Sequence, residues 1–327
     1  MLTSPDATGP ARCHVCGAAD LDVAPAYARF RRVTSDCKPW PAGGTLARCC
    51  ACGGVQTVVT AHWQQEADAI YAGYTIYEQG GGAEQRVFGD DHGIGQPRSD
   101  RLVARLRRSV SLPTRGRLLD IGCGNGGFLS AWSREIPGWS LYGTEVSTEH
   151  LPDLEPLPGF AGLVTGDLSK VAGTFDVISL VHVLEHIPDP IALLKRCREK
   201  LNPDGALFIE VPDCRQNPFM LLVADHCSHF SPALLAALVS AAGFEVREAT
   251  NQWVTKEISV VATPGIGPTA ANSLGCPQAE SEAVFAGWQW LETILAKAAP
   301  LAHRRPFGLF GTAIAATWLD AELDGAA

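Results

Sequence analysis

An aspartate and two histidines crowd the segment ADHCSHFS (224–231), where Asp225 precedes His226 and His229 follows three positions later. A neutral imidazole can remove a proton from a substrate, and an adjacent carboxylate favours the charged ring that results. We therefore predict that His226 is a general base and that Asp225 orients its ring. Two alternatives remain open: the pair only fixes the loop, or the base is His229 or His182.

The elements around this segment are those of an open α/β sheet. The run ALFIEVPD (206–213) is typical of a buried strand, and a helix is expected from Pro232, with Ser231 as its N-cap and Gly243 at its end. Asp225 and His226 then lie on the loop between strand and helix. Sheets of this kind carry their chemistry in such loops.

A second site is indicated by RLLDIGCGNGGF (117–128), a strand that ends near Asp120 and leads through glycines into a helix. The glycines permit a tight turn whose backbone can approach a ligand. Glu145 closes the next strand, 25 residues after Asp120, and can accept hydrogen bonds from both hydroxyls of a ribose. The alternative is that both acids are ordinary strand-end carboxylates.

The segment LLDIGCGNG (118–126) resembles the first motif of class I methyltransferases that use S-adenosylmethionine (SAM). VTGDL (164–168), FDVISLVHVLEHIPDP (175–190) and LNPDGALFIEVPD (201–213) follow in that family's order, so the resemblance covers about residues 100–265. It implies a Rossmann-like fold and a SAM site, in which Asp167 meets the adenine amino group. The implied SAM-binding residues are Asp120, Gly122, Gly124, Asn125, Gly126, Glu145, Asp167, Leu168 and His182.

Four cysteines near the start of the chain form two C-x-x-C-G knuckles, at Cys13 and Cys16 and, 32 residues on, at Cys49 and Cys52. Two such knuckles suit a tetrahedral zinc ion, which would supply folding energy to a small module. The alternatives are reduced, buried thiols or a redox pair, although the turn-like surroundings do not suit a redox motif. We predict a structural Zn²⁺.

With this module in front, the chain resembles zinc-containing C-methyltransferases that act on nucleotide-linked 4-keto-6-deoxysugars. The resemblance places Asp225 and His226 where that family has an acid-histidine pair, and His229 where it commonly has tyrosine. It implies C-methylation of an activated ketosugar through an enolate. The rival functions are O- or N-methylation of another small metabolite and a binding protein that keeps the SAM fold without turnover.

Two further groups have both a chemical and a structural interpretation. Glu185 and His186 could act on the substrate, or their segment LEHIPDP (184–190) could simply cap the helix expected near Pro190. The tyrosines of YAGYTIYEQGGG (71–82) recur every three residues, which places them on one helical face, where packing is the usual role. We expect one of them, with Tyr77 as the candidate, to donate to the enolate oxygen.

The expected organisation is a zinc module at 1–65, a helical connector at 66–100 that could serve as a substrate lid, a SAM-binding domain at 101–265 and a partial α/β segment at 266–327. In the last segment, PFGLFGTAIAATWLDAEL (306–323) looks like a strand, a glycine turn and a helix. A net charge of −9 disfavours a grip on nucleic acid, which needs clustered cations. No apolar run is long enough to span a membrane and the first residues are unlike a secretory signal, so we expect a cytoplasmic protein. An oligomer is compatible with the sequence.

Overall fold

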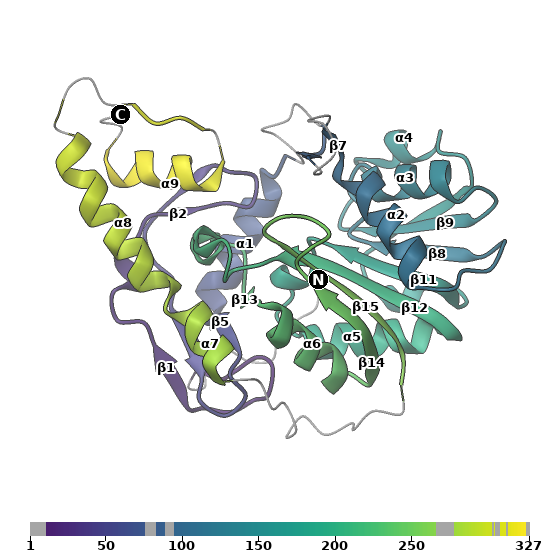
Figure 1. Ribbon diagram of the computed structural model, residues 1–327, viewed down its shortest axis with the longest axis horizontal. Helices are drawn as coiled ribbons and strands as arrows, with labels where there is room; N and C mark the ends of the chain where they lie inside the picture. The colour runs from purple at the N-terminus through teal and green to yellow at the C-terminus, as the bar shows by residue number, and fades with distance from the viewer. Residues whose placement is uncertain are drawn as a thin grey trace.

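A seven-stranded sheet and a smaller N-terminal sheet lie side by side in the computed structural model (Figure 1). The described residues are 11–75, 83–88, 95–265, 278–302, 304, 308–311 and 313–324. Among them, no helix has both the length and the apolar composition needed to cross a bilayer. Tyr77 lies outside these residues.

The large sheet has the strand order β10-β9-β8-β11-β12-β15-β14. The first five strands in this order pair in parallel, whereas β15 runs antiparallel to both of its neighbours. Its strands are β8 (Arg117–Ile121), β9 (Ser140–Glu145), β10 (Phe160–Thr165), β11 (Phe175–Val181), β12 (Leu201–Pro212), β14 (Phe244–Thr250) and β15 (Glu257–Pro264). The carboxyl ends of the parallel strands therefore meet at one edge, where such sheets bind their ligands.

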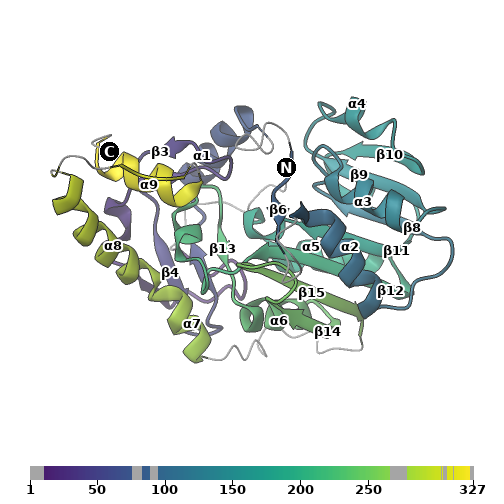
Figure 2. The same ribbon diagram turned by 45° about the horizontal axis from the view of Figure 1, so that its top comes forward.

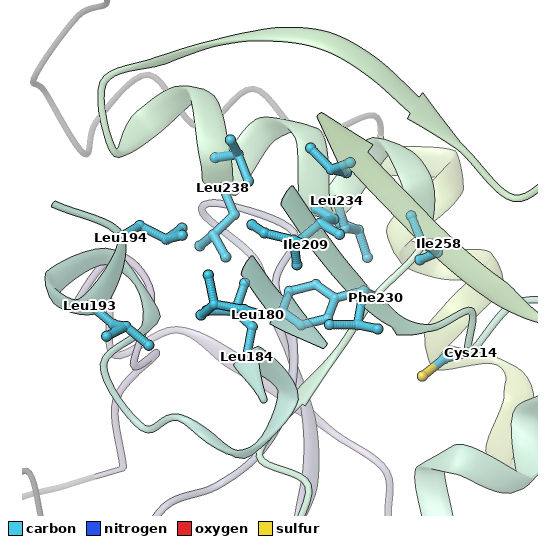
Figure 3. Close-up of a cluster of buried hydrophobic side chains, with 14 of the residues drawn as sticks. Leu180, Leu184, Leu193, Leu194, Ile209, Cys214, Phe230, Leu234, Leu238 and Ile258 are labelled. Atoms are coloured by element: carbon cyan, nitrogen blue, oxygen red, sulfur yellow. The ribbon is translucent and has the colours of Figure 1, made fainter. Parts of the chain in front are cut away.

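Helices cover both faces of this sheet, so its strands are apolar on both sides. The side chains of Leu207 and Ile209 in β12 pack with helices α5 and α6, while Phe208, which points the opposite way, packs with α2 and α3. Figure 3 shows Ile209 among leucines of the α5 and α6 face. The helices are α2 (Arg98–Ser109), α3 (Gly127–Glu135), α4 (Leu151–Leu154), α5 (Pro190–Lys200) and α6 (Pro232–Ala241).

Local sequence explains where α6 and α5 begin. The hydroxyl of Ser231 accepts a hydrogen bond from the Leu234 amide, and Pro232 holds the first position, as predicted. In α5 the cap is Asp189, which accepts from the Ala192 amide. The predicted capping role of the segment LEHIPDP (184–190) is therefore confirmed, but Asp189 performs it and not Glu185 or His186.

The N-terminal sheet has the order β1-β4-β5-β13, and its last strand comes from far along the chain. β13 contains His229 and begins two residues after His226, and it pairs antiparallel with β5. The loop of the large domain is thus built into the small sheet. These strands are β1 (Leu21–Val23), β4 (Leu46–Cys49), β5 (Val55–Thr57) and β13 (Ser228–His229), with β2 (Arg32–Val33) and β3 (Pro39–Trp40) pairing beside them.

Between the two sheets, α1 (Ala61–Ala72) begins at the capping hydroxyl of Thr60 and ends at Gly73. Its end corrects the expectation of one helical face for the tyrosines, because Tyr74 already lies beyond the helix. A short pair, β6 (Arg86–Val87) and β7 (Gln96–Pro97), leads into α2.

The C-terminal region is helical where it is described, with α7 (Gln278–Phe285), α8 (Gly287–Ala302) and α9 (Ile314–Glu322). The strand expected before α9 is absent from residues 308–311, the described part of that stretch. These helices run along the N-terminal module (Figures 1 and 2), where the buried Trp318 ring lies 6.1 Å from that of Phe30. This packing gives them a core that one strand and one helix alone would lack.

Candidate active site

The turn after β8 is shaped by glycines that no other residue could replace easily. Gly122, Gly124 and Gly126 have φ values of 67°, 51° and 82°, in the left-handed region. A Cβ atom on Gly122 would lie 2.5 Å from Cγ2 of Val183. The turn therefore brings the backbone, including the predicted Asn125, close to the end of β11 and to the N-terminus of α3.

Two acids flank this turn, as the sequence predicts. Asp120 is buried and its Oδ1 accepts a hydrogen bond of 2.7 Å from Ser179, while burial raises the pKa of Asp120 to about 7. Glu145 accepts from the amide of Gly124 at 2.7 Å and from that of Val146 at 2.9 Å. These bonds orient the Glu145 carboxylate beside the turn, which is where a ribose-binding acid must be.

Asp167 and Leu168 follow β10 at the same edge of the sheet. Both oxygens of Asp167 are engaged, one by the Ser169 amide and one by the Arg196 guanidinium, each at 2.7 Å. The bonds to Ser169 and the ion pair with Arg196 lower the pKa of Asp167 below its usual range. Leu168 is buried. The adenine contact of Asp167 stays a prediction, since its carboxylate faces Arg196 here.

His182 follows β11 and lies inside a group of charged side chains. Arg98 donates a hydrogen bond of 2.7 Å to Nε2 of His182, and Oε2 of Glu257 is 3.4 Å from the same nitrogen. Nδ1 of His182 lies 3.4 Å from Oε1 of Glu185. Burial and the Arg98 charge lower the pKa of His182. His182 therefore links the cofactor edge to a second cluster.

Two buried glutamates, Glu210 of β12 and Glu257 of β15, belong to the same cluster of charged side chains. Burial raises the pKa of Glu210 to about 7. Burial and the nearby charge of Glu210 raise the pKa of Glu257 well above its usual value. Oε1 of Glu210, Oε2 of Glu257 and both oxygens of Glu185 lack a hydrogen-bond partner among the described residues. Buried carboxylate oxygens of this kind are suited to a cationic or hydrogen-donating ligand.

Asp225 pairs with His186, which differs from the predicted pairing with His226. Nδ1 of His186 lies 3.0 Å from the backbone oxygen of Asp225 and 3.3 Å from its Oδ2. The hydroxyl and amide of Ser35 donate to the two carboxylate oxygens at 2.6 and 3.0 Å. Asp225 pairs with His186 because the loop directs the Asp225 side chain toward the N-terminal module and the 3-10 helix η4 (Leu184–His186).

His226 lies beside this pair, with its ring 4.6 Å from that of His186 and almost perpendicular to it. The ring of His226 forms no hydrogen bond with the described residues. Burial and the His186 charge lower the pKa of His226 to about 4. The neutral ring keeps a lone pair available for a proton or a ligand.

His229 lies in β13, where its ring is held by other protein groups. It is 1% exposed, and its Nε2 is 3.0 Å from the Thr57 hydroxyl in the N-terminal sheet. Its Nδ1 lies 4.0 Å from the buried Cys214 sulfur. With both ring nitrogens facing protein groups, His229 is placed as a packing residue, and the sequence-based alternative that makes it the base has no support in this geometry.

Among the tyrosines, Tyr71 at the end of α1 reaches the cluster. Its ring lies 6.0 Å from that of His186 and 6.2 Å from that of Tyr74. Tyr71 is 42% exposed, so its hydroxyl-bearing ring borders the site without being sealed in it. The candidate role of Tyr77 stays a prediction.

The four predicted cysteines form one cluster in the N-terminal module. Sγ of Cys13 is 3.6 Å from that of Cys52, Sγ of Cys16 is 3.6 Å from that of Cys49, and all four lie within 4.8 Å of one another. A tetrahedral ion with Zn–S bonds of about 2.3 Å separates its sulfurs by roughly 3.8 Å. The amide of Gly54 also points at Sγ of Cys52, at 3.4 Å. The site fits zinc, which would hold the two knuckles together.

Several site residues escaped sequence interpretation: Ser35, Arg98, Glu210 and Glu257. A glutamate inside an apolar strand, as in LFIEVP (207–212), is a usable signal, since burying a charge requires a partner. Ser35 could not have been found from the sequence, because only the fold brings it to Asp225, 190 positions away.

Comparisons with known proteins agree with this geometry. Residues 95–249 match a family model described as a methyltransferase domain. A ubiquinone biosynthesis O-methyltransferase of Xanthomonas axonopodis pv. citri is 29% identical over 187 residues, which cover 49% of this chain and 73% of that protein. One with the same name from Cereibacter sphaeroides is 34% identical over 135 residues, covering 38% and 54%. The chain thus spans from about half to about three quarters of the length of these relatives.

Two solved structures are similar to part of this chain. A methyltransferase of calicheamicin biosynthesis in its SAH-bound form is 24% identical, with a TM-score of 0.41, over 51% of this chain and 54% of that one. The mitomycin 7-O-methyltransferase is 20% identical, with a TM-score of 0.45, over 51% and 53%. At these values they add nothing on the acceptor.

Proposed function

We propose that this SAM-dependent methyltransferase, whose acceptor is a small molecule, methylates a carbon atom of a nucleotide-linked 4-keto-deoxysugar through an enolate. Two supports are the resemblance of its motifs to sugar C-methyltransferases and the zinc-type cysteine cluster in front of the domain. SAM supplies an electrophilic methyl group when bound. We place it against the turn Gly122–Gly126, Glu145, Asp167, Leu168 and His182.

The observation that carries this proposal is the free lone pair of His226 next to the cofactor edge. The carbon beside the ketone becomes a nucleophile only after its proton is removed. C-methylation therefore depends on a base more strongly than O-methylation of an acidic hydroxyl does. His226 takes this proton, and the C–H electrons move toward the carbonyl oxygen. The enolate carbon then bonds to the methyl carbon as the C–S bond breaks, leaving S-adenosylhomocysteine.

Position carries much of the remaining rate, because the attacking carbon must lie in line with the bond that breaks. The proposed SAM site and the cluster around Glu185 lie at the same carboxyl edge of the sheet. His182 connects them, because it belongs to the proposed SAM site and contacts Glu185. Zinc takes no part in these steps and serves the fold of the N-terminal module.

A second candidate is O-methylation of a small hydroxylated metabolite. It is favoured by the names of the two curated relatives, both ubiquinone biosynthesis O-methyltransferases. A histidine base serves either chemistry, so the acceptor atom has to be found by experiment. N-methylation has no comparable support.

The experiment supplies methyl-labelled SAM and a 4-keto-6-deoxy sugar nucleotide to the enzyme in deuterated water, with a dihydroxybenzoate as the rival acceptor. We expect label in the sugar and deuterium at the attacked carbon when SAH replaces SAM, because proton removal precedes transfer. Label in the hydroxylated compound, with no exchange in the sugar, would establish O-methylation instead. Binding of SAM without any labelled product would favour a binding protein.

His226→Ala tests the base within this assay. We expect exchange and transfer to fall together by about 10²- to 10⁴-fold, while SAM affinity stays within a factor of about three. His62→Ala is the matched control, since the side chain of His62 is 78% exposed. Undiminished exchange in His226→Ala would transfer the role of base to another residue, with His182 next to test.

A further inference from the structure

The two neighbouring imidazoles of the candidate site, those of His186 and His226, have opposite environments. His186 and His226 lie with ring centroids 4.6 Å apart and an interplanar angle of 88°. Only His186 is bonded to a carboxylate, and only His226 has both nitrogens without a protein hydrogen bond among the described residues. Two neighbouring groups held in different protonation states are a common arrangement for an acid and a base.

The proton on Nδ1 of His186 is fixed by geometry. That nitrogen faces two acceptors, the backbone oxygen of Asp225 at 3.0 Å and its carboxylate Oδ2 at 3.3 Å. Neither acceptor carries a hydrogen, so His186 must donate from Nδ1. Its Nε2 forms no hydrogen bond with the described residues and is the nitrogen left for a ligand.

Asp225 itself requires a cation nearby. It is completely buried, and in the described part of the chain neither lysine nor arginine forms an ion pair with it. Ser35 donates two hydrogen bonds to it, which hold the carboxylate ionised but supply no positive charge. A buried carboxylate without a counter-charge is costly, so the charged form of His186 is favoured.

The charges that face these rings agree with this assignment. Burial lowers the pKa of His186, but Asp225 and Glu185 outweigh burial and raise it to about 9. For His226, burial and the charge of His186 prevail over the opposing charges of Glu185 and Asp225 and lower the pKa of His226. At neutral pH the site then contains one imidazolium and one neutral imidazole.

We propose that His186, held as a cation by Asp225, donates from Nε2 to the carbonyl oxygen of the acceptor while His226 removes the neighbouring proton. The inference rests on the enolate route above. The proton moves from carbon to His226, the electron pair moves to the carbonyl oxygen, and the hydrogen bond from His186 strengthens as that oxygen becomes negative. His186 keeps its proton, so no further reactant is needed. Asp225 and Ser35 are positioning residues that act through His186.

A first experiment needs no acceptor. The imidazole nitrogens are followed by NMR in ¹⁵N-histidine-labelled, zinc-bound enzyme with SAH, and His186→Gln and His226→Gln provide the assignments. We expect His186 to be doubly protonated at pH 7.5 and to titrate near 9, and His226 to stay neutral over that range. A neutral His186 at pH 7 would overturn the proposal.

Asp225→Asn tests the cause of the charge, because asparagine can keep an acceptor for Nδ1 but has no charge. We expect the His186 titration to move down by more than one pH unit. The matched control is Asp153→Asn at the exposed pair with His150, where the nitrogen-to-oxygen distance is 3.2 Å and solvent screens the charge. The role of Asp225 would be contradicted if Asp225→Asn moved the His186 titration no further than Asp153→Asn moves that of His150.

The same variants are then assayed with the ketosugar. His186→Gln should lower kcat by about 100-fold and change KM by less than threefold, and Asp225→Asn should move the alkaline limb of the pH profile to lower pH. Ser35→Ala should lie between Asp225→Asn and wild type, with Ser35→Thr restoring the profile. An unchanged alkaline limb in Asp225→Asn would reject the link between the two residues.

Two outcomes separate this inference from the function it rests on. If wild type does not turn over the sugar, the proposed acceptor fails, while NMR still decides the charge of His186. Zinc analysis completes the test, because Glu185, His186 and His226 also offer ligand atoms within 4.8 Å of one another. One zinc per chain is expected; a second one lost in His226→Gln would make the rings metal ligands and overturn the acid-base assignment.

Discussion

Nε2 of His14 lies 2.8 Å from the hydroxyl of Ser228, and this contact joins the cysteine cluster to the active-site loop. His14 stands between two of the four cysteines, and Ser228 is the second residue after His226. Ser228 also pairs with Gln56 in the N-terminal sheet. The N-terminal module therefore positions the loop, so a zinc ion held by the four cysteines would affect turnover indirectly.

Loss of zinc should consequently reduce turnover more than SAM binding. Cys16→Ser removes one sulfur from the cluster, so we expect less than one zinc per chain and at least a tenfold fall in kcat, with SAM affinity changed by less than about threefold. Metal analysis and calorimetric titration of SAM measure the two effects. Cys50→Ser is the control, because Cys50 is exposed and outside the cluster. Full zinc occupancy in Cys16→Ser would mean that the ion is not bound by these four sulfurs.

Glu145 is expected to determine cofactor affinity. Hydrogen bonds that involve a charged group contribute about 1.5–3 kcal/mol, so Glu145→Ala should weaken SAM binding by roughly 10- to 100-fold. The exposed Glu149, four positions further on, provides the control in Glu149→Ala. Titration of SAM measures both. Equal affinities in the two variants would show that the carboxylate only braces the turn through Gly124.

Gly122→Ala tests the close approach of the turn to β11. Both Gly122 and Gly138 have positive φ, at 67° and 89°, so alanine strains the backbone at each by about 1–2 kcal/mol. Only at Gly122 would the new methyl group meet another atom, Cγ2 of Val183 at 2.5 Å, whereas Gly138 has open space. We expect Gly122→Ala to weaken SAM binding by more than tenfold and Gly138→Ala to leave it unchanged, both measured by titration. Similar affinities would mean that Val183 moves aside at little cost.

Local signals in the sequence predict much of this structure. The hydroxyl of Ser231 and the ring of Pro232 start α6 where expected, and β8 ends one residue after Asp120, because caps and glycine turns depend on residues only a few positions apart. The predicted Rossmann-like sheet is confirmed, and apolar runs between turn residues mark several of its strands, such as β8, β11 and β12.

Long-range partners are what the sequence leaves open. Neighbouring positions suggested that Asp225 serves His226, yet the fold gives it His186 and Ser35, which lie 39 and 190 positions away. In the same way, the residues next to His229 in the sequence suggest a base, but the pairing of β13 with β5 makes His229 part of the N-terminal sheet. The C-terminal strand was inferred from a glycine-containing run, and helices that pack on the N-terminal module occupy the described part of that region instead.

His229 should make the protein sensitive to acid. Burial lowers the pKa of His229 to about 3, below the value of about 6.5 in an unfolded chain. The unfolded state therefore binds a proton first as pH falls, so the stabilisation is complete above pH 6.5 and is lost progressively toward pH 3. By this linkage the free energy of unfolding falls by about 2 kcal/mol between pH 7.5 and pH 5 through this residue.

His229→Gln tests this effect, because glutamine cannot take up the proton and can keep a hydrogen bond to Thr57. In urea unfolding at the two pH values, the free energy of unfolding should fall less in His229→Gln than in wild type, by about that amount. His62→Gln, at an exposed position, should follow wild type, and parallel losses in wild type and His229→Gln would place the acid sensitivity elsewhere.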